Sequence, residues 1–290
     1  MPSISAPPKI AGTKGYGANI VFSGSTSVER EAVVMKVIEK TGARLVPPYD
    51  HPDIILGQGT LGLELQEDAR DIIAASFVYS DLLDSNSSGS GAGAGAGAVP
   101  AEISFRAPAT RKSPSRQQMP ESKRRNPRLD AILAPCGGGG MLSGVALSCE
   151  GTGIRVFGCE PSYQGADDGR RGYYSATGER VETVSSLTIA DGLRTPVGRI
   201  PWSIIRERRL VAGFFSVSEE EIVSALRLFY ERFKMVVEPS SAVPLAVALY
   251  NEDFRSLVEK EGGEDGWDVG VVVSGGNVSL EALGKLFGSS

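Results

Sequence analysis

The sequence has little of what several classes of enzyme require. It contains a single histidine, His51, and so excludes catalytic chemistry that needs two histidines. A catalytic triad would have to use His51, and no Gly-x-Ser-x-Gly motif accompanies it. We therefore interpret His51 as a surface residue of a polar turn. The three cysteines, Cys136, Cys149 and Cys159, match neither a disulfide framework nor a metal-ligand spacing. They predict a reducing, cytoplasmic compartment.

Long apolar runs are also missing. No stretch of about 18 apolar residues occurs, so no transmembrane helix is expected. The opening residues, MPSISAPPKIAGTK, contain no apolar core of the signal-peptide kind. The net charge of −5 gives no general reason to expect nucleic acid or an anionic membrane as a partner.

What the chain does have is alternation of strand-like and helix-like segments. Strands are predicted at residues 18–22 and 44–46, with a helix over 29–40 between them and Gly42 as its C-cap. GQGTLGLEL, residues 57–65, predicts the opening of another helix. Further on, the pattern predicts strands at 129–135, 154–161 and 270–273, with a helix at 141–151 after the first.

The clearest helix start is a capping box at Ser218 and Glu221. It opens an amphipathic helix, and a second helix is expected to continue over residues 244–250. The apolar face of the first helix is predicted to hold Ile222, Ala225, Leu226, Phe229 and Phe233.

This alternation implies an α/β fold, with a parallel or mixed sheet covered by helices on both faces. In such sheets ligands bind beyond the carboxyl ends of the strands. Two glycine-rich turns, residues 137–140 and 274–277, lie at predicted strand ends.

Residues 84–128 differ in composition from the rest. Gly-Ala and Ser repeats are followed by Pro, Arg and Lys, with too few large apolar residues to offset the entropy of ordering them. We predict a disordered low-complexity insertion within one fold. Its basic half leaves RNA binding or nuclear import as an alternative, although nucleic acid is not the favoured partner.

Four consecutive glycines, Gly137 to Gly140, stand between a predicted strand and a predicted helix. Bare backbone at a helix N-terminus is an anion site, with phosphate its usual ligand. A dinucleotide fingerprint would need glycine at Leu142 or at Ser143, and a P-loop would need a following Gly-Lys-Ser/Thr. A nucleotide-binding oxidoreductase therefore remains only as a disfavoured alternative.

Seven stretches come in the order seen in eukaryotic serine racemases and the related serine/threonine dehydratases. They are APPKIAGTKGYGANIVF (6–22), GQGTLGLE (57–64), GGGGMLSG (137–144), VFGCEPS (156–162), ADGLRTPVG (190–198), VEPSSA (237–242) and VVVSGGNV (271–278). The chain resembles these pyridoxal-phosphate enzymes of fold type II, which are tryptophan synthase β-like, over nearly all of its length outside residues 84–128.

The resemblance implies roles for particular residues. Ser274 would hydrogen-bond the pyridine nitrogen of pyridoxal phosphate, with Gly192 and Glu238 near the ring. A hydroxyl group at that place does not keep the nitrogen protonated, which suits racemisation or elimination at the α-carbon of L-serine or L-threonine. The phosphate would be held by Gly137, Gly138, Gly139, Gly140 and the N–H of Met141.

The resemblance also implies a divalent cation, Mg²⁺ or Ca²⁺, because its matching ligands are all oxygens. They would be Glu160, the carbonyl of Ala166 and Asp168, although EPSYQGADD is longer between Glu160 and Ala166 than the family pattern. An ordinary surface ion pair is the alternative for Glu160. Lys234 matches a family lysine associated with a nucleotide effector, which implies ATP, and the full-length family member is expected to be a homodimer.

One part of the family pattern is not found. The Schiff-base lysine belongs to a Ser-Phe-Lys-x-Arg-Gly-Ala kind of motif, and neither it nor the following Ser-Ser-Gly-Asn-His-like loop occurs here. Because Met1 matches a later point in the family's chain, we expect an N-terminally truncated, inactive protein that exposes apolar edges. A non-catalytic regulatory or partner-binding remnant is the alternative. The expected domains are 1–47, a remnant of the small domain, and 48–83 with 129–290, the large cofactor-binding domain.

Overall fold

The computed structural model describes residues 1–5, 7–24, 27–87 and 127–288. The predicted insertion, residues 84–128, lies outside the described residues except at its two ends. Within the described ranges, no helix combines the length and the apolar character needed to cross a bilayer.

A four-stranded parallel sheet forms the centre of the described fold. Its strands are β1 (Ala131–Pro135), β2 (Arg155–Pro161), β3 (Gly213–Val217) and β4 (Val269–Val271), in the order β3-β2-β1-β4. In the register, Leu133 of β1 lies opposite Phe157 of β2 and Val271 of β4. The expected α/β class is confirmed, and β4 is shorter than the predicted strand at 270–273.

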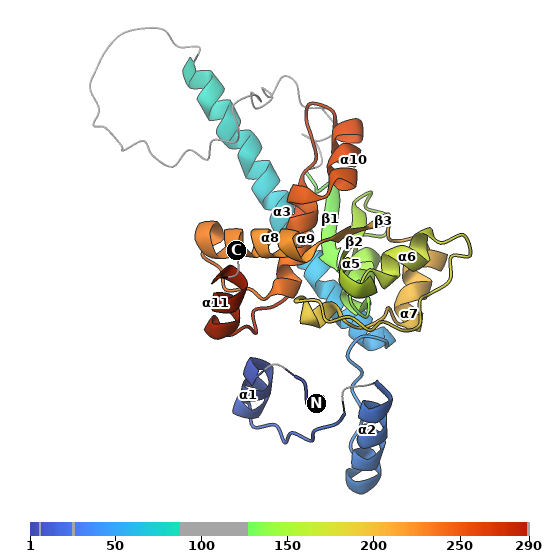
Figure 1. Ribbon diagram of the computed structural model, residues 1–290. Helices are drawn as coiled ribbons and strands as arrows, with labels where there is room; N and C mark the ends of the chain where they lie inside the picture. Colours follow the sequence, from blue (N-terminus) through green and yellow to red (C-terminus); the bar gives the residue numbers. More distant parts are fainter. Residues whose placement is uncertain (6, 25–26, 88–126, 289–290) are drawn as a thin grey trace.

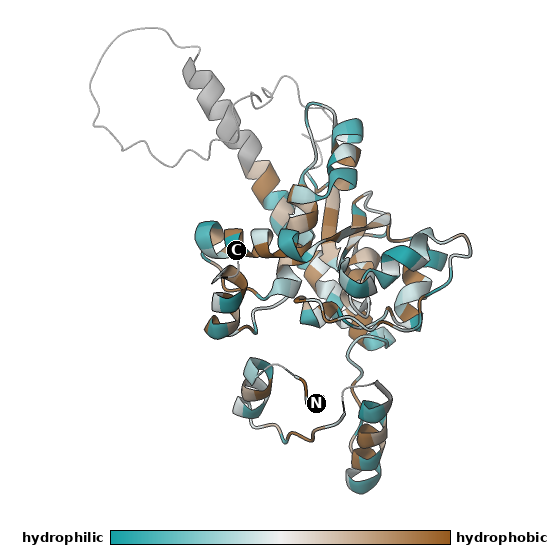
Figure 2. Ribbon diagram, in the orientation of Figure 1, coloured by the Kyte–Doolittle hydropathy of each residue, from teal (hydrophilic) through white to brown (hydrophobic). Residues whose placement is uncertain are grey.

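Helices cover both faces of the sheet because both faces of its strands are apolar. One face packs against α8 (Glu219–Leu228), α9 (Pro239–Tyr250), α10 (Glu252–Gly262) and α11 (Leu280–Gly288). The other packs against α3 (Pro52–Ser87), α5 (Gly140–Ser148), α6 (Asp168–Tyr174) and α7 (Arg199–Trp202). Figure 1 shows this layered arrangement, and Figure 2 shows hydrophilic residues on the outer side of α10.

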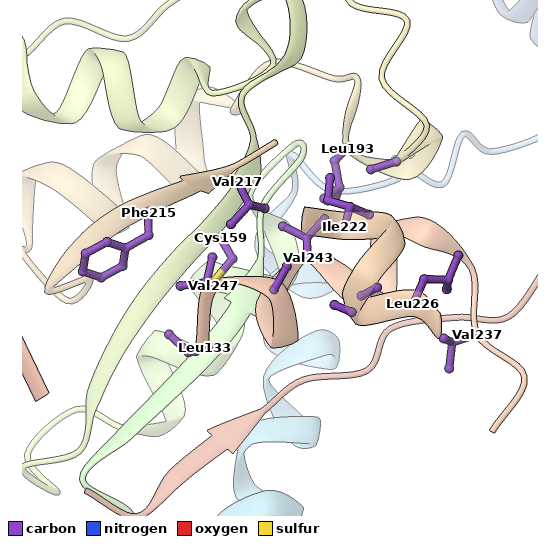
Figure 3. Packing of buried hydrophobic residues seen from close by; sticks show 14 of the residues in the cluster. Leu133, Cys159, Leu193, Phe215, Val217, Ile222, Leu226, Val237, Val243 and Val247 are labelled. Atoms are coloured by element: carbon purple, nitrogen blue, oxygen red, sulfur yellow. The ribbon is translucent and has the colours of Figure 1, made fainter. Parts of the chain in front are cut away.

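Alternation along each strand assigns side chains to the two layers. Leu133, Cys159 and Val217 belong to the cluster with α8 and α9, and Figure 3 shows Val217 and Cys159 near Ile222 and Val243. Ile132, next to Leu133, and Phe214, three positions before Val217, point to the opposite side and join the α3–α5 cluster. A strand buried on both faces reads as continuously apolar, as β1 does.

Several local predictions are confirmed. Ser218 caps α8, its hydroxyl accepting from the N–H of Glu221 while the Glu221 carboxylate accepts from the N–H of Ser218. Ile222, Ala225, Leu226 and Phe229 are buried. Phe233 is 56% exposed, because the chain continues as a π-helical turn, η5 (Phe229–Phe233), which rotates that residue off the apolar face.

The N-terminal part is built differently from the prediction. Helices α1 (Pro7–Gly15) and α2 (Ser27–Thr41) are present, with Gly42 at a φ of +67° after α2. The strands predicted at 18–22 and 44–46 were wrong: the first has only a bridge between Pro2 and Ser23 beside it, and the second has no ladder. β-prone residues without a neighbouring strand to pair with stay as extended chain, with Val21 and Val46 exposed.

Candidate cofactor site

The four-glycine loop joins the carboxyl end of β1 to the start of α5. Gly139 is the N-cap of α5 at a φ of +82°, a left-handed conformation that other residues rarely adopt. A Cβ at Gly137 would lie 2.9 Å from the carbonyl oxygen of Gly192, and one at Gly138 would lie 2.4 Å from Cγ of Tyr49. The loop therefore needs glycine for close packing as well as for its backbone conformation.

The loop forms one wall of a cavity of about 860 Å³. Helix α5 adds the partial positive charge of its N-terminus and N–H groups that have no acceptor within the helix. The eight residues predicted for cofactor binding all line this cavity: Gly137, Gly138, Gly139, Gly140, Met141, Gly192, Glu238 and Ser274. The structure thus brings together residues that lie far apart in the sequence.

Ser274 reaches the cavity because β4 lies beside β1 in the sheet, so the two strands end at the same edge. Its hydroxyl lies 3.2 Å from that of Ser241 in α9. Ser241 in turn donates to the carbonyl of Gly275 and accepts from its N–H, both at 2.7 Å. The Ser274 hydroxyl is therefore held in place by Ser241, which is itself fixed by its two hydrogen bonds to Gly275.

Glu238 lies just before α9, and both its backbone and its side chain have partners. Its N–H donates to the carbonyl of Gly275 at 3.0 Å, and its carboxylate lies 3.6 Å from the ammonium of Lys9. Burial raises the pKa of Glu238, which the charge of Lys9 partly opposes. Nearby, the N–H of Gly192 donates to the hydroxyl of Ser240 at 3.0 Å.

Sequence reasoning missed three cavity residues or neighbours: Tyr49, Arg30 and Lys9. Tyr49 and Arg30 line the cavity, and Lys9 pairs with Glu238 at its edge. Burial, followed by the charge of Asp50, raises the pKa of Tyr49. The sequence signal for Tyr49 was its place directly before the long helix that packs on α5, which brings it to the glycine loop.

The three predicted metal ligands do not line this cavity. Glu160 and Asp168 are buried, at 0% and 1% exposure, and Ala166 is fully buried between them in sequence. The Glu160 carboxylate accepts from the N–H groups of Gly169 and Arg170, at 2.9 and 2.8 Å. Asp168 accepts from the N–H of Val197 at 3.0 Å. The alternative of a surface ion pair for Glu160 is therefore wrong.

The long spacing between Glu160 and Ala166 is accommodated by a local loop. Gln164 and Gly165 adopt positive φ values of 50° and 76° in the short helix η2 (Tyr163–Gly165). The loop lets the chain return, so that the start of α6 still packs against Glu160.

Glu160 and Asp168 are both buried and close to each other, which disfavours their charged forms. Burial, and then the charge of Asp168, raise the pKa of Glu160 well above its usual range, while burial raises the pKa of Asp168 to about 6. In the described part of the chain, neither carboxylate has a lysine or arginine within ion-pair distance. A pair of buried carboxylates fits the oxygen preference of Mg²⁺ or Ca²⁺. Among the described residues, no group of three or more His, Cys, Asp or Glu side chains is arranged so that it could hold a metal ion.

Comparison with known proteins agrees with this arrangement. The family described as "Pyridoxal-phosphate dependent enzyme" matches residues 1–99 and 104–275. The chain is 32% identical to serine racemase of Oryza sativa subsp. indica over 277 residues, which cover 95% of this chain and 62% of the relative. It is 31% identical to L-threo-3-hydroxyaspartate ammonia-lyase of Saccharomyces cerevisiae over 289 residues, 99% of this chain and 67% of that enzyme.

Solved structures give the same result. Maize serine racemase matches with a TM-score of 0.69 and 30% identity, over 99% of this chain and 68% of the maize chain. Serine racemase from Dictyostelium discoideum matches with a TM-score of 0.64 and 31% identity, over 96% of this chain and 68% of that chain. The chain spans about three fifths of the length of the rice relative. From the fold, the glycine loop and these matches, the chain belongs to the family of pyridoxal-phosphate dependent enzymes.

Proposed function

We propose that the cavity between the glycine loop and Ser274 binds pyridoxal phosphate, for racemisation or ammonia elimination of a small amino acid. One observation carries the proposal. Residues proposed to bind the phosphate and residues proposed to border the ring come from four separate segments, and they line a single cavity at the carboxyl edge of the sheet. The lining suits a ligand with an anionic end and an aromatic ring.

In this proposal the N–H groups of Gly137 to Met141 bind the phosphate. The Ser274 hydroxyl hydrogen-bonds the pyridine nitrogen, and Gly192 and Glu238 border the ring. When bound, pyridoxal phosphate supplies an electron sink for the electrons released from the α-carbon. The protein's part is to orient the ring and to leave its nitrogen paired with a neutral hydroxyl.

The substrate class follows from the names of the relatives, serine racemase and hydroxyaspartate ammonia-lyase. We propose a β-hydroxy amino acid, with L-serine or L-threonine as the first compounds to test. Such a substrate carries a carboxylate, and Arg30 is the cationic side chain among the described cavity-lining residues. It can supply the charge that a carboxylate needs.

The same proposal includes a divalent cation, Mg²⁺ or Ca²⁺, held by Glu160, Asp168 and the carbonyl of Ala166. It also includes cytoplasmic action, a homodimer in the full-length family member and ATP as an effector near Lys234. No segment of residues 1–290 matches the family's cofactor-binding lysine motif. We therefore propose that these residues alone bind the cofactor without turnover.

The test is a titration of the 290-residue chain with pyridoxal phosphate, followed by the fluorescence of Trp202 and Trp267 and by the cofactor's absorbance. We expect saturable binding, competition by inorganic phosphate and no competition by NAD(H). Borohydride reduction and peptide mass mapping would then show whether any lysine of the chain becomes modified. No saturable binding would refute the cofactor site, and formation of pyruvate from L-serine would refute the lack of turnover.

A further inference from the structure

Helix α1 contributes no buried residue of its own, so its position depends on a few contacts. The shortest of these come from Lys9. Its ammonium group donates to both carboxylate oxygens of Asp191, at 2.8 and 2.9 Å, across 182 residues of sequence. It also lies 3.6 Å from Oε2 of Glu238. Figure 1 shows α1 on the side of the molecule that carries α11.

The two acids held by Lys9 flank the cofactor cavity. Asp191 directly precedes Gly192, and a Cβ at Gly192 would lie 3.5 Å from Oε1 of Glu238. Both Gly192 and Glu238 line the cavity. Lys9 therefore bridges, from outside, the two segments that border the predicted position of the ring.

The three charged groups form a partly buried unit. The side chains of Lys9, Asp191 and Glu238 are 26%, 29% and 13% exposed. Without Lys9, the carboxylates of Asp191 and Glu238 would repel each other, and each would then gain from moving towards water. Lys285, which lines a neighbouring pocket with Asp191 and Glu238, is paired with Glu281 of its own helix.

We propose that Lys9 is a positioning residue that clamps α1 to Asp191 and Glu238, so that ordering of α1 and binding of the cofactor are coupled. This inference rests on the proposed function, because it takes pyridoxal phosphate as the ligand of the cavity. The ammonium group contacts no reacting atom. It fixes the position of Asp191 and Glu238 at the border of the cavity, so that binding of the cofactor also stabilises α1.

The experiment uses the full 290-residue chain and two readouts. The first is the affinity for pyridoxal phosphate by fluorescence titration, and the second is hydrogen exchange of the backbone amides in α1. Lys9→Met is expected to weaken affinity about fivefold, as for loss of a partly buried ion pair. Lys9→Arg should restore most of it, because the guanidinium group keeps the charge and can reach both acids.

Coupling makes a quantitative demand that a merely structural contact does not. Saturating cofactor slows hydrogen exchange of α1 by one factor in wild type and by a smaller factor in Lys9→Met. The ratio of these two factors must equal the factor by which Lys9→Met lowers the affinity for the cofactor. Lys14→Met is the matched control, because Lys14 is an exposed lysine in the last turn of the same helix. It should leave both readouts unchanged.

Each outcome has one meaning. Absence of saturable binding to wild type would refute the proposed function, and the coupling with it. Binding to wild type that is unchanged in Lys9→Met, or that falls equally in Lys14→Met, would refute the clamp alone. Weaker binding without a matching change in exchange of α1 would also refute it.

Discussion

The aromatic ring of Tyr49 lies directly against Gly138, so that a Cβ on this glycine would come within 2.4 Å of Cγ of the ring. The tyrosine is held there by its neighbour Asp50, whose carboxylate accepts from the N–H groups of Arg199 and Ile200, at 3.0 and 2.9 Å. The segment before α3 thus packs against the glycine loop.

Gly138→Ala is expected to disrupt the cofactor site. A new methyl group would meet a tethered ring at a distance that real Cβ atoms essentially never show. The loop must therefore shift, and we expect the affinity for pyridoxal phosphate to fall by more than about tenfold, because binding through backbone N–H groups depends on their positions. Fluorescence titration measures this loss.

Gly284→Ala is the control, since Gly284 lies in α11 with no atom near an added Cβ. The double variant Gly138→Ala/Tyr49→Ala removes the obstructing ring and should recover part of the affinity. If Gly138→Ala binds the cofactor as wild type does, the glycine loop does not hold the phosphate.

Ser274→Ala tests the ring end of the cavity. Loss of one neutral hydrogen bond is expected to lower cofactor affinity by about 1 kcal/mol, roughly fivefold. The Ser241 hydroxyl keeps its bonds to Gly275 in this variant, so the fold around the turn is expected to persist. Isothermal titration measures the affinity, and unchanged binding by Ser274→Ala would remove Ser274 from the site.

Local features of the fold could be predicted well from the sequence. The capping box at Ser218 depends on residues three positions apart, and the glycine loop on consecutive ones. The strand β1 is recognisable because it is apolar on both faces. Each of these signals is contained within a few residues, so neighbouring sequence is enough to interpret them.

Features that depend on distant partners could not be predicted. The runs at 18–22 and 44–46 have strand-like composition, but a strand forms only where another strand pairs with it. Lys9 and Tyr49 take their places through contacts with residues far along the chain, Lys9 with Asp191 and Tyr49 with Gly138. The local signal for Tyr49 was its position before the long helix, and the residues around Lys9 give no such signal. Gly137 to Gly140 were predicted as an anion site from the sequence itself, whereas Met141, Gly192, Glu238 and Ser274 were predicted through the family resemblance.

Glu219→Gln tests how the loop before Gly192 is positioned. The Glu219 carboxylate accepts from the hydroxyl of Thr188 at 2.6 Å and from the N–H of Ile189 at 2.8 Å. An amide has only one accepting oxygen, so the variant can accept only one of these two hydrogen bonds, and we expect a loss of about 1 kcal/mol in unfolding free energy. Chemical denaturation measures the loss. Glu220→Gln, at the exposed neighbouring position, should change stability far less, and equal effects would contradict the assigned role.

Asp168→Asn separates a cation site from a purely structural carboxylate pair. In buffer containing a chelator, we expect the variant to be about 1–2 kcal/mol more stable than wild type, because it removes one of two buried, mutually repelling carboxylates. The asparagine oxygen can still accept from the N–H of Val197. Added Mg²⁺ or Ca²⁺ should reverse the order: it stabilises wild type by about 2.7 kcal/mol at a hundred times the dissociation constant, and the variant far less. Thermal unfolding with and without cation measures both effects. If the cation changes the stability of wild type and of Asp168→Asn equally, Glu160 and Asp168 hold no cation, and their role is purely structural.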